Sequence, residues 1–115
     1  MAKRFIIWHN PRCSKSREAL ALLEAEAVDL EVRNYLEDPP TVEELRETLR
    51  FLGKRASDIV RRGEAIFGEL HLADADEGAL LAAMAAHPIL IERPILIAED
   101  RAVVGRPPSA VKSLL

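Results

Sequence analysis

The chain has 115 residues, 49% of them hydrophobic, which predicts one domain with a buried core. Its formal charge of -3 at pH 7 excludes a bulk attraction to nucleic acid or to an anionic membrane, so neither is expected as a partner. The single cysteine excludes an internal disulfide and a cysteine-rich metal site, so no metal is expected. No apolar run is long enough for a signal peptide or a membrane span. Together these features predict a soluble, cytoplasmic protein.

The first part of the chain has the pattern of a strand, a helix and a second strand. Arg4–Trp8 is a short apolar run typical of a strand, and Ser16–Ala27 repeats apolar residues at helical spacing. Leu30–Leu36 alternates well enough for a second strand. This order implies a parallel pair of strands joined by a right-handed crossover.

The middle of the chain, at about 41–87, is predicted to be a helical insert. Thr41 and Glu44 have the spacing of a capping box, which predicts the start of a helix that Gly53 ends. Ser57 is the expected N-cap of a short second helix, and further helical stretches follow. Because the insert has no linker composition, the whole chain is predicted to be a single domain.

The last part of the chain is predicted to form a hairpin and a helix. Ile95–Ile97 and Ala102–Val104 are apolar runs joined by a polar turn, and a proline-rich turn then leads into a C-terminal helix. The order βαβ, helical insert, ββα, with Cys13 after the first strand and Pro94 before the third, resembles the thioredoxin superfamily. The predicted fold is therefore an α/β, thioredoxin-like fold with a four-stranded mixed sheet, in which the proline is typically cis and faces the thiol.

Cys13 lies in the turn between the first strand and the first helix, where Pro11 interrupts regular structure. Unpaired N–H groups and the positive end of the helix dipole favour the thiolate there, and Arg12, Lys15 and Arg17 add cationic charge. A lone cysteine is more often a small buried hydrophobe. The polar neighbours of this cysteine instead favour a reactive nucleophile.

Arginines in separate segments are candidates for binding an oxyanion beside that thiolate: Arg61, Arg93 and Arg106. A guanidinium group donates to tetrahedral oxyanions in a planar, bidentate way. Taken singly, each arginine is more often a surface or ion-pairing residue. His9 has two open interpretations, because it could support the Cys13 thiolate or cap the end of the strand.

Four blocks of the sequence resemble, in the same order, the glutathione- and glutaredoxin-dependent arsenate reductases, and together they span nearly the whole chain. The blocks are His9-Asn10-Pro11-Arg12-Cys13-Ser14-Lys15-Ser16-Arg17, Tyr35-Leu36-Glu37-Asp38-Pro39-Pro40-Thr41, His87-Pro88-Ile89-Leu90-Ile91-Glu92-Arg93-Pro94-Ile95 and Gly105-Arg106-Pro107-Pro108. The resemblance implies that Cys13 is the nucleophile, that His9 helps to lower its pKa, and that Arg61, Arg93 and Arg106 bind arsenate. The chain resembles the short form of the family, which lacks the C-terminal extension of the long members.

The resemblance implies the reduction of arsenate, or another small oxyanion, through a thiolate–arsenate adduct on Cys13. Glutathione as co-substrate would resolve the adduct, glutaredoxin as partner would regenerate the thiol, and no bound cofactor would be needed. Ser16 replaces the second cysteine of a Cys-x-x-Cys enzyme, so resolution must come from an external thiol. Pro94, Ser16 and Arg17 are expected to support this site.

Two other functions stay open. A glutathione-dependent thiol reductase would use the same Cys13 and Pro94, with the arginines binding the carboxylates of glutathione. Bacterial stress regulators that bind RNA polymerase also share this fold and resemble this family. Many of these regulators use a dithiol switch, which Ser16 in place of a second cysteine does not allow.

Overall fold

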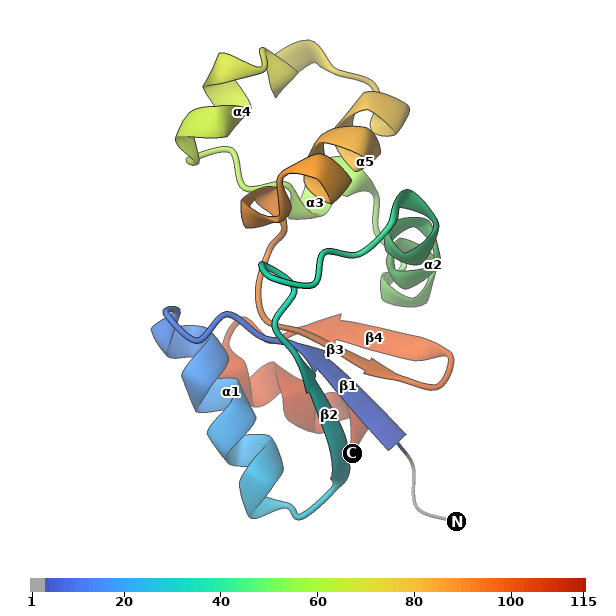
Figure 1. Cartoon of the computed structure of the whole chain (residues 1–115). Helices are drawn as coiled ribbons and strands as arrows, with labels where there is room; N and C mark the ends of the chain where they lie inside the picture. Colours follow the sequence, from blue (N-terminus) through green and yellow to red (C-terminus); the bar gives the residue numbers. More distant parts are fainter. Residues whose placement is uncertain (1–3) are drawn as a thin grey trace. The chain divides into compact units, whose positions relative to one another are not determined.

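A computed structural model describes residues 4–115 of the chain (Figure 1). Residues 1–3, which precede the apolar run at the N-terminus, lie outside the described residues. The chain divides into two compact units, one made of the residues through Asp38 together with Arg93–Leu115, and the other of Pro39–Glu92. The helical insert predicted at about 41–87 lies within the second unit, and the expectation of a single domain stays a prediction.

The first unit contains a four-stranded mixed sheet in the order β2-β1-β3-β4. Strand β1 pairs in parallel with β2 and antiparallel with β3, and β3 pairs with β4 as a hairpin. The predicted strand–helix–strand unit, the hairpin and the four-stranded mixed sheet are therefore confirmed. The strands span Arg4–Trp8 (β1), Asp29–Arg33 (β2), Ile95–Ala98 (β3) and Arg101–Val104 (β4).

Strand β2 is shorter than its alternating pattern predicted, because it ends at Arg33 rather than at Leu36. The side-chain oxygen of Asn34 accepts a hydrogen bond from the N–H of Leu36 at 3.1 Å. The carbonyl of Asn34 accepts from the N–H groups of Glu37 at 3.1 Å and Asp38 at 2.9 Å. These local bonds turn the backbone away from the sheet.

One face of the sheet carries the core of the first unit. The helix α1 (Ser14–Ala25) and the 3₁₀-helix η3 (Pro108–Leu114) pack against it and against each other. The predicted C-terminal helix is thus present as a 3₁₀-helix. Because β1 and α1 both contribute to this core, the turn that carries Cys13 between them is anchored at both ends. The buried core residues are Phe5, Ile7, Ala19, Leu23, Leu96, Ala98, Val111 and Leu114.

The second unit is helical, and α5 packs against α2 and α3. The predicted capping box is present, because the hydroxyl of Thr41 accepts from the N–H of Glu44 and the carboxylate of Glu44 accepts from the N–H of Thr41, both at 3.1 Å. Gly53 ends that helix in the left-handed conformation, with φ of 67°. Among residues 4–115, no helix has the length and apolar character needed to cross a membrane. The helices span Val42–Leu52 (α2), Ala56–Ile59 (α3), Ala65–Glu69 (α4), Leu72–Asp74 (η1), Glu77–Ala86 (α5) and Pro88–Leu90 (η2).

The N-terminus of α3 corrects one expectation, because the residue before the helix is Arg55 and not the predicted cap Ser57. The carboxylate of Asp58 accepts from the N–H of Arg55 at 2.8 Å. The carboxylate of Glu77, which begins α5, accepts from the N–H of Ala56 at 2.8 Å and from the N–H of Ser57 at 3.2 Å. A distant side chain therefore caps this helix, which a search for a local cap does not detect.

Replacing Glu77 with glutamine is expected to lower the free energy of unfolding by about 1 kcal/mol near neutral pH, as for a lost helix cap. Burial raises the pKa of Glu77, but the N–H groups of Ala56 and Ser57 outweigh it and the net pKa is lowered. A lowered pKa means that this stabilisation is present above the ordinary glutamate pKa of about 4.3 and is lost on further acidification. Denaturant unfolding against pH measures it, with Glu69→Gln as the exposed control. A difference that persists at low pH would contradict this role.

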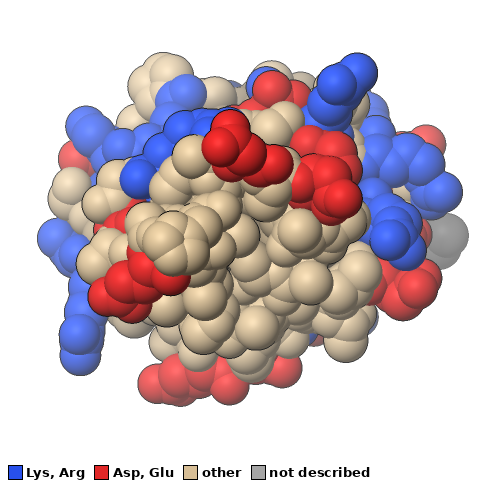
Figure 2. All heavy atoms as spheres, turned by 90° about the horizontal axis from the view of Figure 1, so that it is seen from above, with Lys and Arg blue, Asp and Glu red and all other residues tan. Residues whose placement is uncertain are grey.

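The charged side chains on one face of the molecule do not favour either sign. Figure 2 shows Lys and Arg together with Asp and Glu around a centre of other residues, and neither sign covers the face. Binding to a phosphate backbone requires several cations along its path. The described residues of this face do not form such a basic surface.

Candidate active site

Cys13 is the N-cap residue of α1, in the turn that follows β1. Its N–H donates to the carbonyl of Asn10 at 3.0 Å, and its own carbonyl accepts the first bond of the helix from the N–H of Arg17, also at 3.0 Å. The guanidinium of Arg17 donates to the carbonyl of Pro11 at 2.9 Å, which fastens the turn to the helix. The thiol is partly exposed. The predicted position between strand and helix is confirmed, and the thiol is open to a reactant.

The surroundings of Cys13 favour its thiolate. Burial raises the pKa of the Cys13 thiol, but the other contributions outweigh it and the net pKa is lowered. The largest of these is the backbone N–H of Ser16, followed by the charge of Arg93, the N–H of Lys15 and the guanidinium of Arg106. The thiolate is the nucleophilic form of cysteine. The structure therefore favours the thiolate of a cysteine at a helix N-terminus, and the role of Cys13 as the nucleophile stays a prediction.

Arg93 and Arg106 come together with Cys13 at the edge of the sheet where β1 ends and β3 begins. The Nη1 atom of Arg106 lies 3.9 Å from Cys13 Sγ and donates to the carbonyl of Arg93 at 3.3 Å. Pro94 follows a cis peptide bond, and its carbonyl accepts from the N–H of Gly105 at 2.8 Å. A Cβ atom at Gly105 would lie 2.7 Å from Pro94 Cγ, so only glycine permits this close approach. The hydrogen bond fixes the backbone just before Arg106, and the contact of Nη1 with the carbonyl of Arg93 orients the guanidinium.

His9 contacts Ser16 within the buried side of the turn. Its Nδ1 forms a hydrogen bond of 2.7 Å with Ser16 Oγ, and the same oxygen accepts from the N–H of Asn10 at 3.0 Å. Burial and then the charge of Arg17 lower the pKa of His9, which favours the neutral ring. Its backbone N–H donates to the carbonyl of Arg33 at 2.8 Å, which continues the pairing of β1 with β2. The role of His9 toward the thiol stays a prediction.

Replacing Ser16 with alanine is expected to lower the free energy of unfolding by about 1–3 kcal/mol, because it leaves the buried His9 Nδ1 and the partly buried Asn10 N–H without their partner. The pKa of Cys13 should change little, since the backbone N–H of residue 16 remains. Denaturant unfolding and the pH dependence of thiol alkylation measure the two effects. Ser14→Ala, at an exposed serine in the same turn, is the matched control. Equal stability of the two variants would contradict the bridging role.

Arg61 belongs to the second unit, where the structure shows its local partners. Its Nη1 donates to the carbonyl of Ile89 at 3.2 Å, and its Nη2 lies 3.5 Å from the carboxylate of Glu64. Its backbone N–H donates to the carbonyl of Leu90 at 2.7 Å. The predicted contribution of Arg61 to oxyanion binding stays a prediction.

A polar cavity beside the Cys13 turn was not singled out from the sequence. It has a volume of about 270 Å³, and residues 10–12 and residues 34–37 contribute to its walls. Arg12 belongs to the first block of the family resemblance, and Leu36 and Glu37 belong to the second, but nothing in the sequence indicated that the two blocks line a common cavity. The lining residues are Asn10, Pro11, Arg12, Asn34, Leu36 and Glu37.

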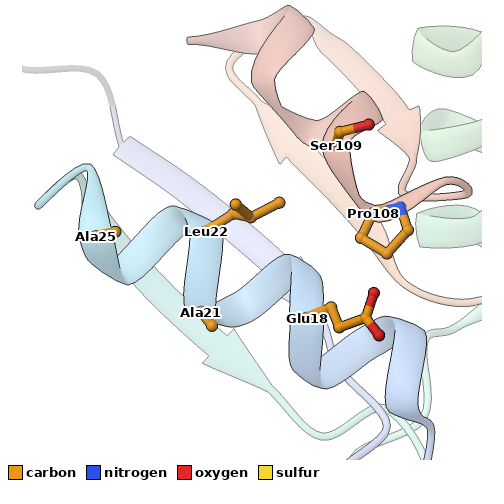
Figure 3. Close-up of a pocket in the computed structure, with 6 residues that line it drawn as sticks. All are labelled: Glu18, Ala21, Leu22, Ala25, Pro108 and Ser109. Carbon is orange, nitrogen blue, oxygen red and sulfur yellow. The ribbon is translucent and has the colours of Figure 1, made fainter.

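A larger hollow of about 540 Å³ lies between α1 and η3 (Figure 3). Glu18 is the ionisable residue among those that line it, so the residues lining the hollow provide neither a thiol nor a cation for an oxyanion. Within residues 4–115, no group of His, Cys, Asp and Glu side chains is placed to hold a metal ion. The residues that line the hollow are Glu18, Ala21, Leu22, Ala25, Pro108 and Ser109.

Comparisons with known proteins agree with this arrangement. The ArsC family model matches residues 8–114. An arsenate reductase of Neisseria meningitidis serogroup A is 45% identical over 112 residues, which cover 95% of this chain and 96% of that protein. The solved structure of an arsenate reductase from Vibrio cholerae matches with a TM-score of 0.95 at 46% identity over 100% of both chains. An arsenate reductase of Escherichia coli is 32% identical over 95% of this chain and 79% of its own length.

Proposed function

Because this chain belongs to the ArsC family, we propose that it reduces arsenate to arsenite with Cys13 as the nucleophile. The observation that carries the proposal is the guanidinium of Arg106 at 3.9 Å from Cys13 Sγ. The lowered pKa of the thiol and the position of Arg93 beside it support the same chemistry. An anionic substrate held by these cations would lie against the nucleophile.

In the first step the Cys13 thiolate attacks arsenic and forms a sulfur–arsenic bond, while one arsenate oxygen leaves as hydroxide or, with a proton, as water. No electrons are transferred in this step. Two unit charges of like sign about 4 Å apart repel by about 4 kcal/mol at an effective dielectric constant of 20. Arg93 and Arg106 would offset this repulsion between thiolate and arsenate.

In the second step the thiolate of glutathione attacks the sulfur of Cys13. A disulfide bond forms, and the electron pair of the sulfur–arsenic bond stays with arsenic, so that As(V) becomes As(III) and leaves as arsenite. Two thiols supply the two electrons, and the scheme uses no metal or bound cofactor. Ser16 cannot resolve the mixed disulfide, so glutaredoxin removes the glutathione and restores the thiol, as expected in a reducing cytoplasm.

The test is a coupled assay with glutathione, glutaredoxin and glutathione reductase, in which arsenate addition should start NADPH consumption and arsenite formation. Omitting glutaredoxin should stop turnover after the mixed disulfide has formed. An arsenate-dependent rate no higher than that of Cys13→Ser would overturn the proposal. Activity on glutathionylated substrates that survives Arg93→Ala, without arsenate turnover, would identify a thiol reductase instead.

A further inference from the structure

The cavity beside the Cys13 turn lies on the opposite side of this turn from Arg93 and Arg106. The sheet order β2-β1-β3-β4 places β1, which leads to Cys13, between its two neighbours. The turn at residues 34–37 follows β2, which is parallel to β1, so it lies at the same edge of the sheet. Arg93 precedes β3 and Arg106 follows β4, on the other side of β1. The turn that carries Cys13 therefore has the two arginines on one side and the cavity on the other.

The cavity is lined by amide N–H donors, one cation and one anion that form no hydrogen bond or ion pair through these groups within the described part of the chain. The side-chain oxygen of Asn10 accepts from the N–H of Arg12 at 2.9 Å, and that of Asn34 accepts from the N–H of Leu36 at 3.1 Å. Each amide oxygen is committed to its own turn, which leaves the amide N–H groups as donors. Within the described part of the chain, these N–H groups donate to no protein atom, and Arg12 and Glu37 form no ion pair.

We propose that this cavity binds the γ-glutamyl end of glutathione. This end carries a carboxylate and an ammonium group on one carbon atom. Arg12 and the amide groups of Asn10 and Asn34 match the carboxylate, and Glu37 matches the ammonium. The inference rests on the proposed function, since it names the residues that recognise the thiol co-substrate of that reaction.

The position of the cavity suits the second step of the reaction. Adjacent Cα atoms are about 3.8 Å apart, so the wall formed by Arg12 is one peptide unit from Cys13. An extended peptide spans about 3.3–3.6 Å per residue, so the thiol of glutathione, one residue beyond the anchored end, matches the one-residue separation between Arg12 and Cys13. A thiolate attacks sulfur most readily opposite the bond that breaks. Glutathione would then approach from the cavity while arsenic leaves on the side of Arg93 and Arg106.

Thiol–disulfide exchange tests the cavity without arsenate. The Cys13 thiolate attacks oxidised glutathione, forming the mixed disulfide and releasing one glutathione thiolate, and bis(2-hydroxyethyl) disulfide serves as an uncharged reference that reacts with the same sulfur. Dividing the two rates removes any change in the reactivity of the thiol itself. For Arg12→Gln and for Glu37→Gln, this ratio should fall by about three- to ten-fold, the range expected when an exposed charge-assisted hydrogen bond is lost.

Two exposed residues outside the cavity provide the matched controls. Lys15→Gln removes a cation from the same turn, and Glu26→Gln removes an anion beyond the end of α1, and both should leave the ratio unchanged. In the coupled assay, Arg12→Gln should raise KM for glutathione without raising KM for arsenate. Wild type should prefer γ-glutamylcysteine to cysteinylglycine, and the variant should lose this preference.

The outcomes separate this inference from the proposed function. If the protein turns over arsenate but the ratio of the two exchange rates is the same in wild type, Arg12→Gln and Glu37→Gln, the glutathione site alone is overturned. A lowered ratio in both variants without arsenate turnover would overturn the proposed function and support the glutathione site. If the ratio falls as much in Lys15→Gln as in Arg12→Gln, the effect is one of general charge, and the proposed glutathione site is overturned.

Discussion

Replacing Cys13 with serine should abolish arsenate reduction, with a loss in kcat/KM of roughly 10⁴-fold or more, as when other enzymes lose their nucleophile. A serine hydroxyl is not ionised near neutral pH, and it can form neither the sulfur–arsenic bond nor the disulfide that supplies the electrons. The fold should persist, because serine is a favoured residue at the N-cap position that Cys13 occupies. The coupled assay measures the loss, and thermal unfolding checks stability.

Ser14→Ala provides the control for this change, since it alters the neighbouring exposed residue and leaves the sulfur in place. It should retain most of the wild-type rate. A folded Cys13→Ser variant that reduces arsenate at a rate close to wild type would contradict the assignment of the nucleophile.

Replacing Arg106 with alanine should lower kcat/KM for arsenate by about 10²–10³-fold, the loss seen when a donor to a developing oxyanion is removed. The same change should raise the pKa of Cys13, because it removes the guanidinium whose Nη1 lies 3.9 Å from Sγ. Arg106→Lys should recover only part of the activity, since lysine keeps the charge and loses the planar fork. Steady-state kinetics with arsenate and thiol alkylation against pH measure the two effects.

Arg101→Ala is the matched control, because Arg101 is an exposed arginine at the start of β4, the strand that leads to Arg106. It should change neither the arsenate kinetics nor the pKa of the thiol. If Arg106→Ala and Arg101→Ala behaved alike, the guanidinium beside the sulfur would have no part in the reaction.

The features that could be predicted from the sequence depend on neighbouring residues. The turn around Cys13 follows from Pro11 between a strand and a helix, and the start of α2 follows from the spacing of Thr41 and Glu44. In both places the backbone partners lie within a few residues along the chain. The order of the strands in the chain was accessible as well, because β1, β3 and β4 are short apolar runs bounded by polar or proline-containing turns.

The features that could not be predicted depend on contacts between distant segments. The cap of α3 comes from Glu77, and the cavity beside Cys13 combines Arg12 with the turn at residues 34–37. Local spacing carries no signal for such contacts. The convergence of Arg106 on Cys13 was expected from the resemblance to a family and from the fold, and the hydrogen bond between Gly105 and Pro94 supplies a physical reason for it.

The proposed reaction requires that Cys13 is a thiolate beside cations that bind an oxyanion. The rate of Cys13 alkylation against pH, with and without arsenate or sulfate, measures both requirements. Because the pKa is lowered, the rate should stay high well below the pKa of a free cysteine, about 8.5, and either oxyanion should slow the reaction by covering the sulfur. A rate that follows free cysteine and is indifferent to both oxyanions would contradict the account.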